Sequence, residues 1–310
     1  MDILSEITDH KRIEVELQKQ AVSPEQLREQ VRDLMENSPA PRRSMKRALA
    51  SSPAGIIAEF KRRSPSKGWI YETAKADEIP AAYEAAGASA ISILTDEKFF
   101  GGSLRDIRTA RPLVDIPILR KDFIIDEYQL LQARIVGADA VLLIAACLTQ
   151  KECADLTARA HALGLEVLLE IHSPRELAYI SKDVDMVGVN NRNLGTFVTD
   201  VENSFRIAGQ LRQTIAGVRN ISDAQDAPDV RNISDACNVP DAQGSSDTPR
   251  NLPLLVSESG ISHPETICRL RTAGFRGFLI GETFMKTPQP GDALKGFIQG
   301  IEETEAQKSL

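Results

Sequence analysis

Short apolar runs recur along most of this chain, and they limit the folds that it can adopt. From residue 55 onward eight runs follow one another, separated by amphipathic stretches that are each long enough for a helix. The runs are continuous rather than alternating, which is typical of strands buried on both faces. They are GIIAEF (55–60), SAISIL (89–94), IPIL (116–119), DAVLLI (139–144), LEVLLE (165–170), DMVGVN (185–190), LPLLVS (252–257) and RGFLIG (276–281).

Eight strand–helix units in series predict an α/β fold, a TIM (β/α)8 barrel. A doubly wound open sheet is the competing architecture, but it would have fewer strands per domain, and no Gly-x-Gly-x-x-Gly follows the first run. A barrel of this kind needs about 250 residues. The chain has 310 residues, so we expect additions to the barrel.

Helical patterns dominate the start of the chain. Ile3 with Ile7, and Ile13 with Leu17, are apolar pairs four residues apart, as on one face of a helix. We interpret the proline- and serine-rich stretch that follows, 38–55, as a linker. The predicted division is therefore an N-terminal helical extension at 1–50, the barrel at 51–300 and a tail at 301–310.

Four segments have the pattern of a capping box, in which a serine or threonine is followed three residues later by glutamate or glutamine. They are 23–26, 149–152, 173–176 and 262–265. Each predicts the start of a helix.

One interval between strands is much longer than the others. It lies before the seventh run, where VRNISDAQDAPD (218–229) is followed directly by VRNISDACNVPD (230–241), a tandem duplication rich in Asp, Asn and Ser. We interpret about 216–251 as a long, flexible surface insertion before strand 7, with a lid or partner-binding element as the alternative. Because it precedes a strand, it should leave the barrel at the N-terminal face, away from the chemistry.

Charge and cysteine usage exclude several classes of protein. A net charge of −7 argues against a general binder of nucleic acids or anionic membranes. The four cysteines are scattered without a C-x-x-C pair, which favours a reducing, cytoplasmic location over a disulfide framework or a zinc site. The chain start lacks the apolar core of a signal peptide, and no apolar stretch is long enough to span a membrane. No His/Asp/Glu cluster has metal-ligand spacing, so we expect no metal and no other cofactor.

Ionisable residues stand where the apolar runs end. Glu59 is the last residue but one of the first run, and Lys61 directly follows that run. Lys121 lies two residues after the third run, and Glu170 is the last residue of the fifth. Barrel enzymes place their chemistry at the C-terminal ends of the strands, and a charge at such a site is costly unless it is paired or used. Adjacent lysines and glutamates can divide acid and base roles, although Lys121 and Glu170 taken alone also fit a structural ion pair. Glycines after the seventh and eighth runs are typical of a barrel phosphate site, so the pattern indicates a phosphorylated, anionic substrate and proton transfer.

Several long motifs make the chain resemble the indole-3-glycerol-phosphate synthase family. They are IIAEFKRRSPSKG, SILTDEKFFGGS, LRKDFIID, GADAVLLIAACL, LLEIHS, GVNNRNL, SESGI and LIGETFM, and they follow the family's order from about residue 50 to 290. The resemblance implies a carboxy-lyase of tryptophan biosynthesis. Its reaction is ring closure, decarboxylation and dehydration of 1-(2-carboxyphenylamino)-1-deoxyribulose 5-phosphate to indole-3-glycerol phosphate. It also implies possible association with other enzymes of that pathway.

The resemblance assigns roles to individual residues. Lys121 matches the general acid of ring closure, Glu170 the general base of dehydration, and Lys61 the lysine that holds the substrate carboxylate. Glu59 and Asn190 match polar residues around the reacting atoms. The substrate pocket and the phosphate site are matched by Ser64, Phe100, Phe123, Arg192, Ser259, Gly260, Gly281 and Glu282.

Four expectations concern the surroundings of these residues. We expect burial or a neighbouring cation to lower the pKa of Lys121 toward neutrality. A glutamate side chain cannot accept a hydrogen bond from a phosphate dianion, so Glu282 should offer its backbone N–H and turn its side chain away. His172 should also point away, in the turn after Glu170. A basic field around the substrate is expected from Lys61, Arg62, Arg63, Lys67, Arg120 and Lys121.

Two other functions compete with this interpretation. A sugar-phosphate isomerase or epimerase would share the barrel and the phosphate site, but it would not need two lysines and two glutamates at strands one, three and five. A barrel that has lost its activity could act as a binding scaffold through the long insertion. The presence of Glu59, Lys61, Lys121 and Glu170 argues against that second alternative.

Overall fold

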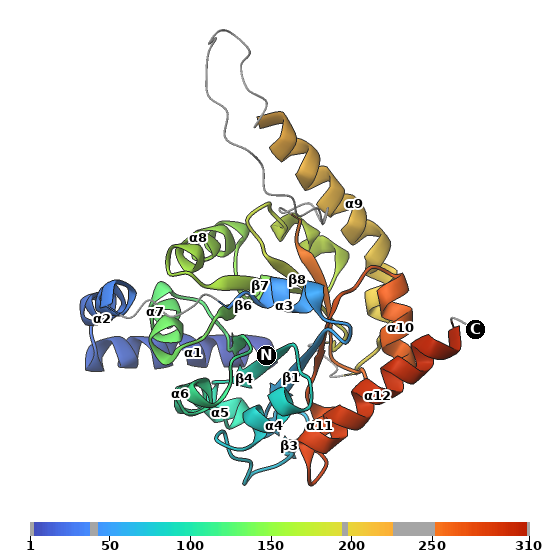
Figure 1. Ribbon diagram of the computed structural model, residues 1–310. Helices are drawn as coiled ribbons and strands as arrows, with labels where there is room; N and C mark the ends of the chain where they lie inside the picture. Colours follow the sequence, from blue (N-terminus) through green and yellow to red (C-terminus); the bar gives the residue numbers. More distant parts are fainter. Residues whose placement is uncertain (1–2, 38–42, 194–197, 226–251, 309–310) are drawn as a thin grey trace, which may run out of the picture.

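The computed structural model describes residues 3–37, 43–193, 198–225 and 252–308, and the side chains of 219–225 are outside that description. Eight parallel strands form a closed barrel in which each strand pairs with the next, and the last pairs with the first (Figure 1). The barrel strands are β1 (Ile56–Phe60), β4 (Ala90–Leu94), β5 (Ile118–Lys121), β6 (Ala140–Ile144), β7 (Glu166–Ile171), β8 (Met186–Asn190), β9 (Leu254–Glu258) and β10 (Gly277–Ile280). Every predicted strand is present, and the TIM-barrel prediction is confirmed.

Helices surround the barrel on its outside (Figure 1). Two strands begin two residues later than expected: β5, which continues through Lys121, and β9, which continues through Glu258. The helices are α4 (Ile79–Ala85), α5 (Glu97–Phe100), α6 (Leu104–Ala110), α7 (Glu127–Val136), α8 (Gln150–Ala162), α9 (Glu202–Gln225), α10 (Pro264–Thr272), α11 (Glu282–Met285) and α12 (Pro290–Lys308), with short 3₁₀ turns η1 (Arg111–Leu113), η2 (Ala145–Cys147) and η3 (Pro174–Tyr179). None of the described helices is both long enough and apolar enough to cross a bilayer.

The strands divide their side chains between two cores. On β1, Ile57 contributes to the cluster inside the barrel, whereas Ile56 and Ala58 contribute to the larger cluster between the strands and the outer helices. This alternation follows from the two-residue period of a strand. The continuous apolar runs of the sequence therefore reflect burial on both faces.

Three helices precede the barrel: α1 (Ile3–Ala21), α2 (Pro24–Asn37) and α3 (Met45–Ser51). The predicted helix is present, although Ile13 and Leu17 are 61% and 59% exposed. The buried face of α1 follows Ile7, Lys11 and Val15 instead, which are spaced four residues apart and all lie against the barrel side.

The stretch interpreted as a linker contains α3. Met45 and Leu49 of this helix are fully buried in the cluster that fills the barrel interior. The helix was not predicted because serines and prolines flank it on both sides. Ser44 is its N-cap and accepts a hydrogen bond from the backbone N–H of Arg47.

The capping-box predictions have mixed outcomes. The boxes at 23–26 and 149–152 are present with both reciprocal hydrogen bonds. The segment at 173–176 starts η3 rather than an α-helix. The box at 262–265 is wrong, because α10 has His263 as its N-cap and Pro264 at its first position. Proline favours that first position and so moves the helix start by one residue.

Two segments extend beyond the regular pattern of the barrel. A two-stranded antiparallel hairpin, β2 (Arg63–Ser64) with β3 (Gly68–Trp69), follows β1. Helix α9 continues through Gln225, so the insertion predicted at about 216–251 begins within a helix, and its residues 226–251 lie outside the described residues. Helix α12 also runs through 301–308 of the expected tail. The division of the chain into an extension, a barrel and a tail stays a prediction.

Candidate active site

Strand alternation places chemically active side chains at one end of the barrel interior. The interior cluster includes Ile57, Leu119, Leu168, Met186, Val256 and Leu279. Two residues further along each strand, the next inward position is polar, charged or glycine. These positions are Glu59, Lys121, Glu170, Gly188, Glu258 and Gly281, and Asn190 is the inward position that follows Gly188.

A cavity of about 620 Å³ opens at this end of the barrel. All of the predicted site residues line it, so the structure brings together side chains that are far apart in the sequence. They are Glu59, Lys61, Ser64, Phe100, Lys121, Phe123, Glu170, Asn190, Arg192, Ser259, Gly260, Gly281 and Glu282. The volume suits a ligand of the size of a substituted sugar phosphate.

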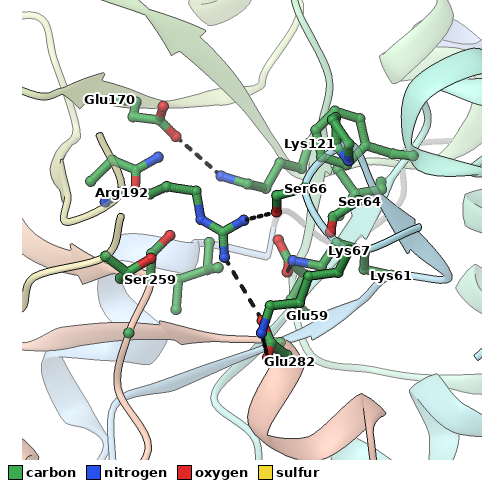
Figure 2. Close-up of a pocket in the computed structure, with 18 of the residues that line it drawn as sticks. Glu59, Lys61, Ser64, Ser66, Lys67, Lys121, Glu170, Arg192, Ser259 and Glu282 are labelled. Carbon is green, nitrogen blue, oxygen red and sulfur yellow. Dashed lines mark hydrogen bonds and ion pairs between the residues drawn. The ribbon is translucent and has the colours of Figure 1, made fainter. Parts of the chain in front are cut away.

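Lys121 lies at the centre of the charged part of the cavity. Its Nζ is 3.2 Å from Oε2 of Glu170 and 2.9 Å from Oε2 of Glu258. Figure 2 shows the ammonium directed at Glu170. One cation therefore joins carboxylates from two other strands.

The pKa of Lys121 moves in the direction opposite to our expectation. Burial alone would lower the pKa, but Glu258, Glu170 and Glu59 raise it well above its usual value. The expectation of a lysine near neutrality is wrong because it neglected carboxylates supplied by other strands. Lys121 is therefore a protonated ammonium at neutral pH.

The two carboxylates on Lys121 have pKa values that move apart. Burial raises the pKa of Glu258 to about 7, and the like charge of Glu170 adds to this rise against the attraction of Lys121. Burial also acts to raise the pKa of Glu170, but Lys121, His172 and Asn190 together hold it well below its usual value. Glu170 therefore stays ionised at neutral pH, whereas Glu258 can carry a proton near pH 7.

Glu258 is a candidate site residue that the sequence analysis missed. It directly follows the seventh predicted strand and ends β9, and its inward position follows the same two-residue alternation that selects Lys121 and Glu170. That register could have identified it. Gly188 on the neighbouring strand leaves room for it, since a Cβ added at Gly188 would lie 2.0 Å from Oε1 of Glu258.

A second lysine–glutamate pair lies on the β1 side of the cavity. Lys61 Nζ is 2.6 Å from Oε2 of Glu59, which is buried. Burial would raise the pKa of Glu59, but Lys61, Lys121 and Arg192 lower it. Gly281 permits this arrangement, because a Cβ there would lie 2.1 Å from Oε2 of Glu59.

The remaining polar end of the cavity combines backbone with cations. Ser259 has a φ of +69°, in the left-handed region that a residue with a Cβ rarely adopts. Arg192 NH1 donates to Oγ of Ser66 at 3.1 Å, and its NH2 is 3.8 Å from Oε2 of Glu282 (Figure 2). Backbone strain beside two arginine contacts is typical of a ligand-binding position.

The Glu282 side chain does not turn away from the site as expected. It lines the cavity, forms an ion pair with Lys67, and lies near Arg192. Burial would raise its pKa, but Lys67, Arg192 and Lys61 lower it. The physical reason is attraction, because Lys67 and Arg192 are both close to the carboxylate.

The basic field of the site is smaller than expected. Arg62 donates to both oxygens of Asp106, at 2.6 and 2.9 Å, and Arg120 pairs with Asp122 at 2.9 Å. Neither of these arginines lines the cavity, and neither does Arg63. The cations that do line it are Lys61, Lys67, Lys121, Arg192 and Lys286.

Apolar side chains form the opposite wall. The rings of Phe100 and Phe123 lie 6.0 Å apart between centroids. Ile3, Leu4 and Ile7 of α1 line the same cavity, so the N-terminal helix supplies part of the wall. An aromatic group would be held between the two phenylalanines and this helix.

His172 points toward the site rather than away from it. Its Nε2 lies 3.2 Å from Oε1 of Glu170, and its Nδ1 lies 3.8 Å from Oε2 of Glu176. Burial lowers the pKa of His172, but Glu170 and Glu176 raise it further than burial lowers it. Glu170 thus contacts Lys121 through one oxygen and His172 through the other.

Fold and site together define a class of protein: a (β/α)8-barrel enzyme for acid–base chemistry on an anionic substrate. The sequence profile described as "Indole-3-glycerol phosphate synthase" matches residues 4–238. A protein of that name from Bacteroides thetaiotaomicron is 64% identical over 97% of this chain and 99% of its own length. Another from Magnetococcus marinus is 38% identical over 95% of this chain and 97% of its own length.

The chain belongs to the indole-3-glycerol phosphate synthase family, the carboxy-lyases of tryptophan biosynthesis. Its substrate is a small phosphorylated molecule. A solved mutant tryptophan synthase alpha-subunit from Pyrococcus furiosus aligns with a TM-score of 0.53 at 14% identity, covering 81% of this chain and 98% of that one. This likeness shows the fold alone.

Proposed function

We propose that Lys121, Glu170, Lys61, Glu59 and Asn190 carry out the chemistry of indole-3-glycerol phosphate formation at this cavity. The observation that carries the proposal is the Lys121 ammonium held between Glu170 and Glu258, with the Lys61–Glu59 pair across the same cavity. Ring closure, decarboxylation and dehydration need an acid, a base and a cation near one carbon framework, and this arrangement provides all three.

Lys121 acts first in this proposal, as the general acid of ring closure. The aromatic carbon attacks the ribulose carbonyl carbon, the C=O π pair moves to oxygen, and that oxygen takes a proton from the Lys121 ammonium. A lysine whose pKa is raised is already protonated at neutral pH. The negative charge that develops on the carbonyl oxygen makes it basic enough to accept the proton.

Lys61 then holds the substrate carboxylate beside the reacting carbon. Loss of carbon dioxide leaves its bonding electron pair in the ring system, and a nearby cation stabilises the charge as it develops. Glu59, at 2.6 Å, keeps the Lys61 ammonium directed into the cavity.

Glu170 serves as the base of dehydration. Its pKa is held low by Lys121, His172 and Asn190 against the effect of burial, so it is ionised when it must accept a proton. Departure of the hydroxyl group requires a proton on its oxygen, and Glu258, with a pKa raised to about 7, is positioned through Lys121 to resupply one.

The phosphate group occupies the end of the cavity formed by Ser259, Gly260, Gly281 and Glu282. Backbone N–H groups at these positions would donate to the phosphate oxygens. Lys67 and Arg192, which pair with Glu282 in this structure, supply the positive charge. Phe100, Phe123 and Ser64 complete the walls around the rest of the substrate.

A direct assay tests the proposed roles. Purified protein is mixed with 1-(2-carboxyphenylamino)-1-deoxyribulose 5-phosphate, and indole-3-glycerol phosphate is followed by fluorescence. Turnover by the parent that is lost on substitution of Lys121 or Glu170 supports the assignment. A folded parent protein without turnover, or undiminished turnover in both variants, contradicts it.

We also propose a cytoplasmic location, supported by the free cysteines Cys153 and Cys268 of the described residues. Association with other enzymes of tryptophan synthesis stays a prediction. Co-sedimentation of the purified protein with those enzymes tests it.

A further inference from the structure

Lys11 is a fully buried lysine outside the site described above. It belongs to α1 and has no exposed side-chain surface. Its Nζ lies 2.9 Å from Asp96, 3.1 Å from Asp122 and 2.9 Å from Glu14. A buried charge is costly unless it is paired, and this one is paired with carboxylates from two different loops of the barrel mouth.

The first of these loops follows β4 and is held through Asp96. One oxygen of Asp96 accepts hydrogen bonds from the backbone N–H groups of Phe99 and Phe100, at 2.7 and 3.3 Å, and caps α5. The other oxygen contacts Lys11. The Asp96 carboxylate therefore links the Lys11 ammonium to the backbone N–H of Phe100, whose side chain forms part of the aromatic wall.

The second loop follows β5 and is held through Asp122. Oδ1 of Asp122 contacts Lys11 and accepts from the backbone N–H of Phe123 at 2.8 Å. Its Oδ2 accepts from Thr95 at 2.6 Å and from Arg120 at 2.9 Å. Asp122 also directly follows Lys121, the proposed general acid, in the chain. Its carboxylate therefore fixes the backbone on both sides, next to Lys121 and at the N–H of Phe123.

The helix that carries Lys11 contributes to the same wall. Ile7 lies one turn before Lys11 and lines the cavity with Ile3 and Leu4. Lys11 therefore joins three segments that meet at the aromatic wall: α1, the loop with Phe100 and the loop with Phe123.

We propose that Lys11 is a positioning residue for the reaction: by pairing with Asp96 and Asp122 it sets the two phenylalanine-bearing loops and α1 around the aromatic part of the substrate. This deepens the proposed function and rests on it. Misplacement of a reacting group by about 1 Å can reduce turnover about a hundredfold, so a loosened wall lowers kcat.

The test compares substitutions on one helix. Lys11→Met removes the central cation, and Lys11→Met with Asp96→Asn removes one positive and one negative charge while the asparagine can still cap α5. Lys19→Met is the matched control. Lys19 also ties α1 to the barrel, through Asp126 at 2.7 Å, and it pairs with Glu16 of its own helix at 2.9 Å, but it does not line the cavity.

The only tryptophan of the chain supplies a second measurement. Trp69 packs on the loop with Phe100, since a Cβ added at Gly101 would lie 2.7 Å from its ring. Release of that loop exposes the indole further, so quenching of its fluorescence by acrylamide should increase in the Lys11 variants. A lysine that only adds stability would leave the quenching of the folded protein unchanged.

We expect both Lys11 variants to fold, to lose at least about tenfold in kcat and to show stronger quenching of Trp69, with Lys19→Met within about twofold of the parent. A folded Lys11 variant with parental kcat overturns the proposal. An equal loss in Lys19→Met, or failure of both Lys11 variants to fold, also overturns it, because Lys11 would then act on stability. Absence of turnover in the parent protein would instead reject the proposed function itself.

Discussion

Lys121 and Glu258 contact each other across the interior of the barrel, with 2.9 Å between Nζ and Oε2. Their strands, β5 and β9, are not neighbours in the sheet. The contact is possible because both residues occupy inward positions at the same end of the barrel. The site is thus held together through its centre, and its charges interact strongly in a buried environment.

Lys121→Ala should reduce kcat by at least about a hundredfold, the usual scale for loss of one general acid. The same change leaves Glu170 and Glu258 without their shared cation, so the remaining activity should also depend differently on pH. Stopped-time fluorescence of the indole product measures the rate. Lys151→Ala is the control, since that side chain is 85% exposed on α8. Parental activity in Lys121→Ala would reject the acid role.

Glu258→Gln should change how stability depends on pH. The pKa of Glu258 is about 7 in the folded protein and near 4.5 when unperturbed. Between these values the folded state keeps a proton that the unfolded state has released, so stability falls as pH rises, by roughly 2–3 kcal/mol in total. Glu258→Gln has no carboxylate at this position, so its folding stability should not fall with pH for this reason.

Thermal unfolding at pH 5, 6 and 7 measures the difference. The melting temperature of the parent should fall more steeply than that of Glu258→Gln, with the exposed Glu302→Gln as a control that behaves like the parent. His172 and His161 also have raised pKa values and act in the same direction above pH 6.5, but they are present in all three proteins. Equal slopes in parent and variant would contradict a proton on Glu258.

Much of the fold was predictable because the apolar runs record burial on both faces of each strand. The site residues could also be located. Glu59, Lys121 and Glu170 occupy the last inward position of their strands, where charged side chains replace apolar ones. The sequence does not show which strands face one another across the barrel. That is why the direction of the Lys121 pKa was predicted wrongly. Glu258 was missed although its position follows the same register as Lys121 and Glu170.

Lys11 shows a second limit of sequence patterns. A lysine on an amphipathic helix is expected on the solvent side, whereas Ile13 and Leu17 have the four-residue spacing of a packed face and are exposed. Its carboxylate partners, Asp96 and Asp122, come from loops that are distant in sequence. Only the folded chain brings them together, so periodicity alone selects the wrong face of α1.

Lys67 and Glu282 should have opposite effects on substrate binding. Lys67→Ala removes a cation from the phosphate end, so we expect KM to rise about tenfold with little change in kcat. Glu282→Gln removes the carboxylate that competes with phosphate for Lys67 and Arg192, so KM should fall. Steady-state kinetics and inhibition by inorganic phosphate measure both effects.

The control for this pair is Lys75→Ala. Lys75 pairs with Glu78 at 2.6 Å, but both side chains are more than half exposed and neither lines the cavity. Its substitution should leave KM unchanged. Unchanged KM in Lys67→Ala would exclude Lys67 from the phosphate site.

His172→Leu should shift the pH dependence of turnover. The histidine lowers the pKa of Glu170 through the contact between its Nε2 and Oε1 of that carboxylate at 3.2 Å. Without it the pKa of Glu170 rises. A base must be ionised to work, so the acidic limb of the kcat profile should move to higher pH, while kcat on the alkaline side of that limb changes by less than about tenfold.

Kinetics from pH 9 down to below pH 4.5, the ordinary pKa of a glutamate, measure the limb. His161→Leu is the matched control, because His161 also contacts a carboxylate, Asp185, at 2.8 Å, but lies away from the cavity. Its profile should coincide with that of the parent. A His172→Leu profile that keeps the parental limb would show that Lys121 and Asn190 suffice to hold Glu170 ionised. A limb that moves to lower pH would mean that the histidine, rather than the carboxylate, carries the titration that controls turnover.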